Sequence, residues 1–158
     1  MVQATPFLLV LFLALGAHGH TVKKCILTGH WKNDIGSNMT ISEVKENGDF
    51  TGIYNTSVST TTKIVPSPLL GSQHLPYLWN QPTFGFTVHW NFSNSISVFT
   101  GQCFVDNDGK EVLKTMWLMR SYVGKLEDDW KATRIGYNVF VRQETHEGGK
   151  VEFPEEMQ

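Results

Sequence analysis

The sequence predicts an all-β fold, namely an eight-stranded antiparallel up-and-down β-barrel. Three observations carry this prediction. Hydropathy alternates from one residue to the next through most of residues 20–143, without a sustained helical period. The alternating segments are rich in Thr, Val, Phe, Trp and Tyr, which strands prefer. Short turn sequences such as Asn107-Asp108-Gly109 separate them. Closure into a barrel leaves no exposed sheet edge, while a β-sandwich stays the alternative architecture.

Eight candidate strands follow one another along the chain. They span residues 29–34, 38–44, 50–58, 67–73, 83–92, 96–106, 110–120 and 130–142. Turn signals stand between them: Glu46-Asn47-Gly48-Asp49 follows the second strand, Ser93-Asn94-Ser95 the fifth, and Asn107-Asp108-Gly109 the sixth. Short connections of this kind favour antiparallel pairing between strands that are neighbours in the sequence.

Length and composition restrict the class of protein. A chain of 158 residues is one domain's worth, and 41% hydrophobic with 12% aromatic residues excludes disorder over most of it. Lys and Arg number 13 against 15 Asp and Glu, and this net charge of −2 argues against a nucleic-acid binder. Only 18% of residues are charged, below the usual value of about 25%. The chain is rich in rings and hydroxyl groups instead.

Neither terminus is expected to belong to the barrel. Residues 5–19 form the only long apolar run and are too short for a membrane span, which needs about 20 residues. Because small residues follow at Ala17 and Gly19, residues 1–19 are interpreted as a secretory signal peptide; a buried N-terminal helix is the alternative. Without a second apolar run, no membrane anchor is expected. Residues 144–158 are acidic and aperiodic and are predicted to form a flexible tail, which leaves 20–143 for the barrel.

A signal peptide implies a secreted, extracellular protein, in which an even cysteine count favours a disulfide. The two cysteines are Cys25 and Cys103, and two buried free thiols are the alternative. The sequence has no C-x-x-C pair, which would indicate a redox or thiolate-zinc site. Neither a metal nor a cofactor is predicted. N-x-S/T sequons occur at Asn38, Asn55 and Asn91. Asn38, in a predicted turn, is the preferred glycosylation site.

Alternate residues of the candidate strands share one face of the sheet. On that face large rings are mixed with short, neutral polar side chains, and no charged side chain appears. Its members are Asn33, Ile35, Ser37, Tyr54, Thr56, Val58, Phe84, Phe86, Val88, Trp90, Phe92, Ser97, Phe99, Gly101, Cys103, Leu113, Thr115, Trp117, Met119, Gly136, Asn138 and Phe140. Eight-stranded barrels can hold one small ligand, so this face fits a pocket for a compact, neutral, amide-like molecule with an apolar body. Ordinary packing with internal hydrogen bonds fits the same pattern equally well.

Five segments of the chain closely resemble the avidin family of biotin-binding proteins. They are LTGHWKNDIGSNMTI (27–41), FTGIYNTSV (50–58), QPTFGFTVHWNFS (81–93), VFTGQCFVDNDGKEVLKTMWL (98–118) and DDWKATRIGYNVFVR (128–142). The resemblance runs in order and at nearly constant spacing from about Lys24 to Arg142. It implies an eight-stranded barrel that binds biotin very tightly, without catalysis, as a homotetramer.

The resemblance also implies roles for individual residues. The ureido oxygen of biotin would accept hydrogen bonds from Asn33, Ser37 and Tyr54, and the ureido N–H groups would donate to Thr56 and Asn138. Three donors suit a polarised urea oxygen. A hydroxyl group near the ring sulfur would come from Ser97. The rings around the bicycle would be Trp90, Phe92, Phe99 and Trp117, beside Met119. The valerate carboxylate would meet Val58, Ser59, Thr60, Thr61, Ser93 and Ser95.

The same resemblance extends to subunit contacts. Trp130 matches the family residue that crosses into a neighbouring subunit's site, so full affinity is expected to need the oligomer. Met116, Ile135 and Tyr137 match positions at another subunit contact, where Tyr137 replaces an aliphatic residue and is expected to pack. The loop after Val58 departs from the family pattern at Thr60 and is one residue shorter, so this loop is where the site is expected to differ.

Other classes of protein fit the residues less well. An enzyme would need a nucleophile–base pair or a metal set, yet G-x-S-x-G, HExxH and glycine-rich phosphate motifs are missing. The histidines His30, His74, His89 and His146 are scattered, and His89 is predicted to face outward. A lipocalin-like carrier would not need so many polar groups in its pocket. In a purely structural secreted glycoprotein, side chains would fill the barrel.

Overall fold

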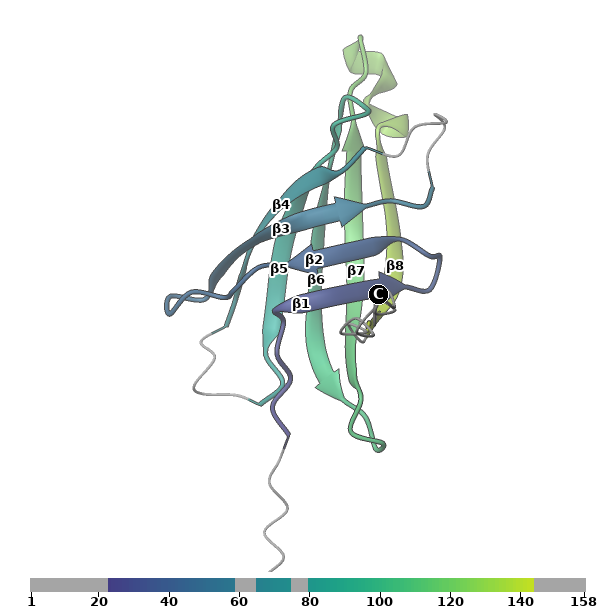
Figure 1. Cartoon of the computed structure of the whole chain (residues 1–158). Helices are drawn as coiled ribbons and strands as arrows, with labels where there is room; N and C mark the ends of the chain where they lie inside the picture. The colour runs from purple at the N-terminus through teal and green to yellow at the C-terminus, as the bar shows by residue number, and fades with distance from the viewer. Residues whose placement is uncertain (1–22, 59–64, 75–79, 144–158) are drawn as a thin grey trace, which may run out of the picture.

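The computed structural model describes residues 23–58, 65–74 and 80–143, which form a closed barrel (Figure 1). Each strand pairs antiparallel with the next along the chain, and the last strand pairs with the first. The strands are β1 (Gly29–Asn33), β2 (Asn38–Ile41), β3 (Asp49–Asn55), β4 (Ser67–Gln73), β5 (Thr83–His89), β6 (Ser95–Val105), β7 (Glu111–Ser121) and β8 (Thr133–Arg142). The prediction of an eight-stranded up-and-down barrel is therefore confirmed, and the sandwich alternative is excluded.

Four predicted strand boundaries are wrong by three residues. β2 ends at Ile41 and not at residue 44, β3 ends at Asn55 and not at residue 58, and β5 ends at His89 and not at residue 92. The last strand begins at Thr133 and not at residue 130, because Leu126–Lys131 form a 3-10 helix, η1. The carbonyl of Lys125 accepts the N–H of Asp128 at 3.1 Å, and the carbonyl of Asp129 accepts the N–H of Ala132 at 3.0 Å. Such i to i+3 hydrogen bonds are typical of a short connector between strands. They keep Trp130 out of the β7–β8 ladder.

Three predictions concern residues outside the described ranges. These are the signal peptide at 1–19, the acidic tail at 144–158, and the loop residues Ser59, Thr60 and Thr61.

The predicted alternation of side chains is confirmed along the strands, except at the start of β8, where Thr133, Arg134 and Ile135 are all exposed. Ile35 and Val58, which were predicted on the inward face, lie beyond the ends of β1 and β3 and are exposed. The largest fully buried side chains are Trp31, Phe50 and Phe140. The residues next to them on each strand point outward, toward solvent. Inside, the rings of Phe84, Phe86 and Phe99 stack in a row, with centroids 6.2 and 4.6 Å apart. Rings stacked in this way contribute more than their buried area alone, so this row forms the wall of β5 and β6 that faces the interior.

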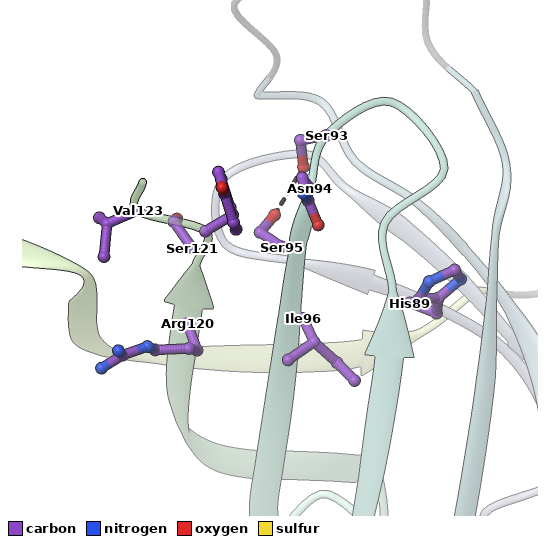
Figure 2. Close-up of a pocket in the computed structure, with 9 residues that line it drawn as sticks. His89, Ser93, Asn94, Ser95, Ile96, Arg120, Ser121 and Val123 are labelled. Carbon is purple, nitrogen blue, oxygen red and sulfur yellow. Dashed lines mark hydrogen bonds between the residues drawn. The ribbon is translucent and has the colours of Figure 1, made fainter. Parts of the chain in front are cut away.

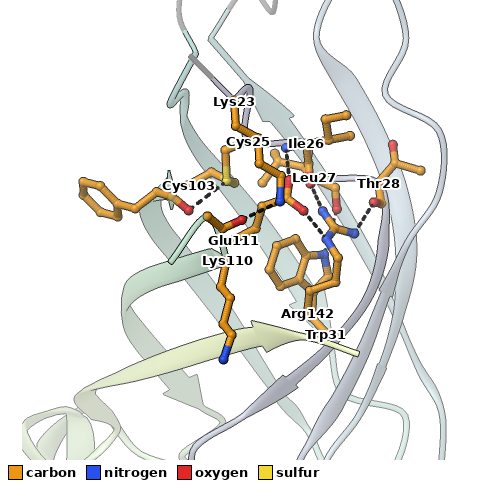
Figure 3. Close-up of polar contacts among 12 residues, drawn as sticks. Lys23, Cys25, Ile26, Leu27, Thr28, Trp31, Cys103, Lys110, Glu111 and Arg142 are labelled. Carbon is orange, nitrogen blue, oxygen red and sulfur yellow. Dashed lines mark hydrogen bonds and ion pairs between the residues drawn. A yellow bond between two sulfur atoms is a disulfide. The ribbon is translucent and has the colours of Figure 1, made fainter. Parts of the chain in front are cut away.

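At the end of the barrel where β1 begins, residues from the two termini of the described chain contact each other (Figure 3). A disulfide joins Cys25 to Cys103, with their Cα atoms 5.8 Å apart, as predicted. The Arg142 guanidinium donates to the carbonyls of Ile26 and Thr28, pairs with the Glu111 carboxylate, and lies 4.3 Å from the ring centroid of Trp31. These contacts close this end. The opposite end, where β1 finishes at Asn33, is called the site end below.

The outer surface of β6, β7 and β8 carries many exposed apolar side chains. They include Ile96, Val98, Met116, Leu118, Ile135, Tyr137 and Val141. An exposed apolar sheet face of this extent indicates contact with another protein surface. Within the described ranges, no helix is long and apolar enough to cross a membrane.

Candidate functional site

Three polar side chains converge at the site end, and all three are buried. Asn33 closes β1, Ser37 lies after the turn, and Tyr54 comes from β3. The turn between the first two needs Gly36, whose φ of 88° disfavours other residues. The Asn33 Oδ1 accepts the backbone N–H of Ser37 at 2.7 Å and that of Ile35 at 3.2 Å. These bonds fix the amide so that its Nδ2 faces inward and donates to the Tyr54 hydroxyl at 3.1 Å.

The Tyr54 phenol is neutral over the physiological range. Burial raises its pKa to about 12, although hydrogen bonds with Ser37 and Asn33 oppose the shift. The ring is fixed by Trp90, Phe99 and Phe140, whose centroids lie 5.3, 5.8 and 6.2 Å away. Because the Tyr54 oxygen already accepts from Asn33, its proton remains available as a donor. This cluster can therefore donate several hydrogen bonds to one acceptor.

On β8, the strand paired with β1, Asn138 presents an acceptor. Its Nδ2 donates to the Asp34 Oδ1 at 2.9 Å, and its Oδ1 accepts the indole N–H of Trp117 at 3.0 Å. The Asp34 carboxylate thereby determines which side of the amide faces the interior. A carbonyl oxygen has two lone pairs, so Asn138 Oδ1 retains one for a further donor.

Asp34 is a site residue that the sequence reasoning missed. It lies in the turn directly after Asn33, and its backbone N–H donates to the carbonyl of Val139 at 3.0 Å. The turn is therefore attached to β8, the strand that carries Asn138. The sequence signal was a carboxylate next to a predicted site residue. Only the closure of β8 against β1 brings that carboxylate to Asn138.

Two hydroxyl groups add to this arrangement. Thr56 Oγ1 donates to the carbonyl of Val58 at 3.0 Å and accepts its N–H at 3.2 Å. Because its proton is already used, this hydroxyl group can only accept from a ligand. Ser97 Oγ accepts the indole N–H of Trp90 at 2.8 Å, which leaves the Ser97 proton free to donate. Both hydroxyl groups belong to buried residues.

Aromatic side chains surround these polar groups. Trp90 and Phe99 are buried, Phe92 lies 5.5 Å from Trp90 between ring centroids, and Trp117 is half-buried. The Trp117 indole fits because residue 136 on β8 is glycine: a Cβ there would lie 2.2 Å from the Trp117 Cζ2. Met119 follows Trp117 on the same face of β7 and is half-buried.

At the rim, the predicted carboxylate contacts are more exposed. Ser93 Oγ and Ser95 Oγ form a hydrogen bond of 2.5 Å, and the side chain of Val58 is exposed. Both serines line a depression of about 430 Å³, together with outward-facing His89, Ile96 and Arg120; Figure 2 shows these side chains. This depression therefore lies on the outer side of the barrel wall and is not the interior. The outward orientation predicted for His89 is confirmed.

Trp130 is the predicted site residue that lies apart from the others within one chain. It lies on η1, and 82% of its surface is exposed. Met116, Ile135 and Tyr137 point outward from β7 and β8, with 53%, 68% and 71% of their surfaces exposed. Elsewhere within residues 23–58, 65–74 and 80–143, no three His, Cys, Asp or Glu side chains gather as metal ligands do.

A closed β-barrel whose one end combines rings with oriented donors and acceptors defines a class, the small-molecule-binding β-barrels. Within this class, the chain belongs to the avidin family: the model described as the Avidin family matches residues 21–143.

Individual relatives agree. Chicken (Gallus gallus) avidin is 58% identical over 149 residues, covering 92% of this chain and 98% of avidin. Two similar solved structures are AVR2, with a TM-score of 0.73, 60% identity and coverage of 78% of this chain and 99% of AVR2, and a biotin binding protein from chicken, with a TM-score of 0.72, 53% identity and coverage of 77% and 100%.

Proposed function

We propose that this chain is a secreted protein that binds and sequesters biotin, without catalysis, at the site end of its barrel. Members of the avidin family bind biotin and form tetramers. One structural observation carries the proposal to this chain's residues. Donors from Asn33, Ser37 and Tyr54 lie on one side of the site end, and the oriented acceptor of Asn138 comes from another strand.

This polarity is complementary to a cyclic urea. A urea has one strong acceptor, its carbonyl oxygen, flanked by two N–H donors. The oxygen would take the three donors, while the N–H groups would take Thr56 Oγ1 and Asn138 Oδ1. Charge developing on the urea oxygen strengthens such hydrogen bonds. Because protein partners already orient the Asn33 and Asn138 amides, little ordering of these two groups is required on binding.

The apolar part of biotin would lie among the rings. Trp90, Phe92, Phe99 and Trp117 provide a surface for the fused rings, with Met119 beside them and the Ser97 hydroxyl near the sulfur. The valerate carboxylate would be held at the rim by Ser93, Ser95, Val58 and the loop residues Ser59, Thr60 and Thr61. Neutral hydroxyl and N–H donors suffice for an anion at a solvated rim.

The oligomer is proposed to complete the site. Trp130 is too exposed on its own subunit to contribute there, so we assign it to the site of a neighbouring subunit in a homotetramer. The exposed strip of Met116, Ile135 and Tyr137 would form a second subunit contact. Burial of such rings and aliphatic chains stabilises association in proportion to the apolar area covered.

The domain arrangement follows from the same proposal. Residues 1–19 would direct secretion, residues 20–143 would form the barrel, and residues 144–158 would form a solvated acidic tail. The Cys25–Cys103 disulfide suits an oxidising compartment. Asn38 is exposed on β2 and is the proposed glycan site. The near-neutral net charge of −2 gives no basis for binding nucleic acid.

Titration calorimetry with biotin tests the proposal. The mature protein should saturate at one biotin per subunit with sub-nanomolar affinity, and Asn33→Ala and Asn138→Ala should each weaken binding. A long-chain fatty acid serves as the competing ligand, because a lipocalin-like carrier would bind it and the polar cluster should reject it. Folded protein that fails to bind biotin would contradict the proposal.

A further inference from the structure

Ser57, a residue with no role in the proposal above, contacts the donor cluster directly. It follows Thr56 after the end of β3, and its side chain is exposed. Its backbone N–H donates to Ser37 Oγ at 3.0 Å, and its own Oγ lies 3.2 Å from Ser37 Oγ. The same Ser57 Oγ donates to the carbonyl of Ile35 at 2.6 Å. Ser57 therefore connects both sides of the turn that holds Ser37.

The direction of these bonds follows from the number of protons. A hydroxyl group has one proton, and that of Ser57 is used on the Ile35 carbonyl. In the Ser37–Ser57 pair, Ser57 Oγ must then be the acceptor and Ser37 the donor. The Tyr54 hydroxyl is the other group near Ser37 that can accept the Ser37 proton. The Ser37 proton that a ligand oxygen would need is therefore already engaged within the protein.

We infer that Ser57 is a positioning residue that weakens ligand binding, because its hydroxyl group competes with the ligand for the proton of Ser37. When a ligand carbonyl enters, Ser37 must turn its O–H from Ser57 Oγ to the ligand oxygen. The backbone N–H of Ser57 keeps its bond to Ser37 Oγ throughout, so the oxygen stays in place while its proton turns. This inference rests on the proposed function and adds a residue that adjusts it.

The main test is the dissociation rate of biotin from Ser57→Ala, measured by displacing labelled biotin with an excess of unlabelled biotin. Removal of the competing acceptor keeps every donor, since the backbone N–H remains. A neutral hydrogen bond contributes a net of about 0.5–1.5 kcal/mol, which corresponds to roughly two- to tenfold. Dissociation should slow by that factor. Ser57→Thr retains the hydroxyl group and should keep the rate of the unsubstituted protein.

A matched control separates the loss of the Ser57 hydroxyl group from the loss of a glycan. Ser57 is also the hydroxyl residue of the Asn55 sequon, so Ser57→Ala abolishes any glycan at Asn55 as well. Asn55→Gln removes the sequon and leaves Ser57 in place. Its dissociation rate should equal that of the unsubstituted protein. If Asn55→Gln slows dissociation as much as Ser57→Ala does, the glycan is responsible and the inference is wrong.

A double-mutant cycle with Ser37→Ala isolates the coupling. Ser57→Ala should change the rate only while Ser37 is present, because competition for a proton requires that proton. An unchanged or faster rate for Ser57→Ala alone would overturn the inference, the latter meaning that Ser57 orients Ser37 productively. If the unsubstituted protein does not bind biotin at all, both the proposed function and the inference fail. Binding without an effect of Ser57→Ala overturns the inference only.

Discussion

The Asp34 carboxylate accepts a hydrogen bond from the Asn138 amide at 2.9 Å across the seam where β8 closes on β1. The two residues are 104 positions apart in the sequence. This bond assigns the two ends of the amide, and it turns a side chain that could donate or accept into one that accepts toward the interior. The polarity of the site thus depends on the barrel's closure.

Replacing Asp34 with Ala should weaken biotin binding by about ten- to a hundredfold, because a hydrogen bond to a charged group contributes about 1.5–3 kcal/mol. Without the carboxylate, the Asn138 Nδ2 loses its partner, and only the Trp117 N–H still holds the amide with Oδ1 available to the ureido N–H. Calorimetry or dissociation rates measure the loss. Asp108→Ala, in the turn between β6 and β7, is the matched control and should bind normally. Equal affinities for the two variants would rule out the role assigned to Asp34.

The stability of the protein should fall as pH rises from about 10 to about 12. Tyr54 has a pKa near 12 when folded because it is buried, whereas an unfolded tyrosine ionises near 10. Between these values the folded state binds more protons than the unfolded state, so the Tyr54 contribution is complete below pH 10 and is lost by pH 12. Denaturant midpoints across this range measure the slope. Tyr54→Phe should flatten the slope, while Tyr122→Phe, at an exposed ring, should leave it unchanged.

Trp130→Ala should weaken biotin binding without destabilising the subunit. The Trp130 side chain is 82% exposed within its own chain, so its removal costs few internal contacts. If it covers a neighbouring subunit's ligand, biotin dissociation should accelerate in the assembled protein. Leu126→Ala, which removes another exposed apolar side chain of η1, is the comparison. A monomer in sedimentation experiments that binds biotin with undiminished affinity would refute the assignment of Trp130 to a neighbour's site.

Gly136→Ala should reduce both stability and affinity. The new Cβ would lie 2.2 Å from the Trp117 Cζ2, so the indole must move away from Asn138. Overpacking of this kind costs about 1–3 kcal/mol, which thermal denaturation would detect. Gly124→Ala is the control, because nothing lies within 4 Å of a Cβ at that position. A Gly136→Ala protein with unchanged melting temperature and biotin binding would show that the Trp117 position is not restricted by Gly136.

The sequence by itself determined the class and most of the architecture. Alternation is a local property, because successive side chains in a strand must point to opposite faces. The eight strands, the buried rings of Phe84, Phe86 and Phe99, and the outward position of His89 therefore follow from neighbouring residues alone. The resemblance to the avidin family likewise depends on residues in order, and the family match over residues 21–143 confirms it.

Only the tertiary structure decided which polar atoms donate and which accept. Asn33 and Asn138 carry the same amide group, yet one presents Nδ2 and the other Oδ1 to the interior. That difference is set by partners at Ser37 and Asp34, and the second partner is reached only when β8 closes on β1. The strand register does not predict this difference between the two amides, because the direction of a hydrogen bond depends on which protons are already used. The same proton count is the basis for the inference that Ser57 competes with the ligand.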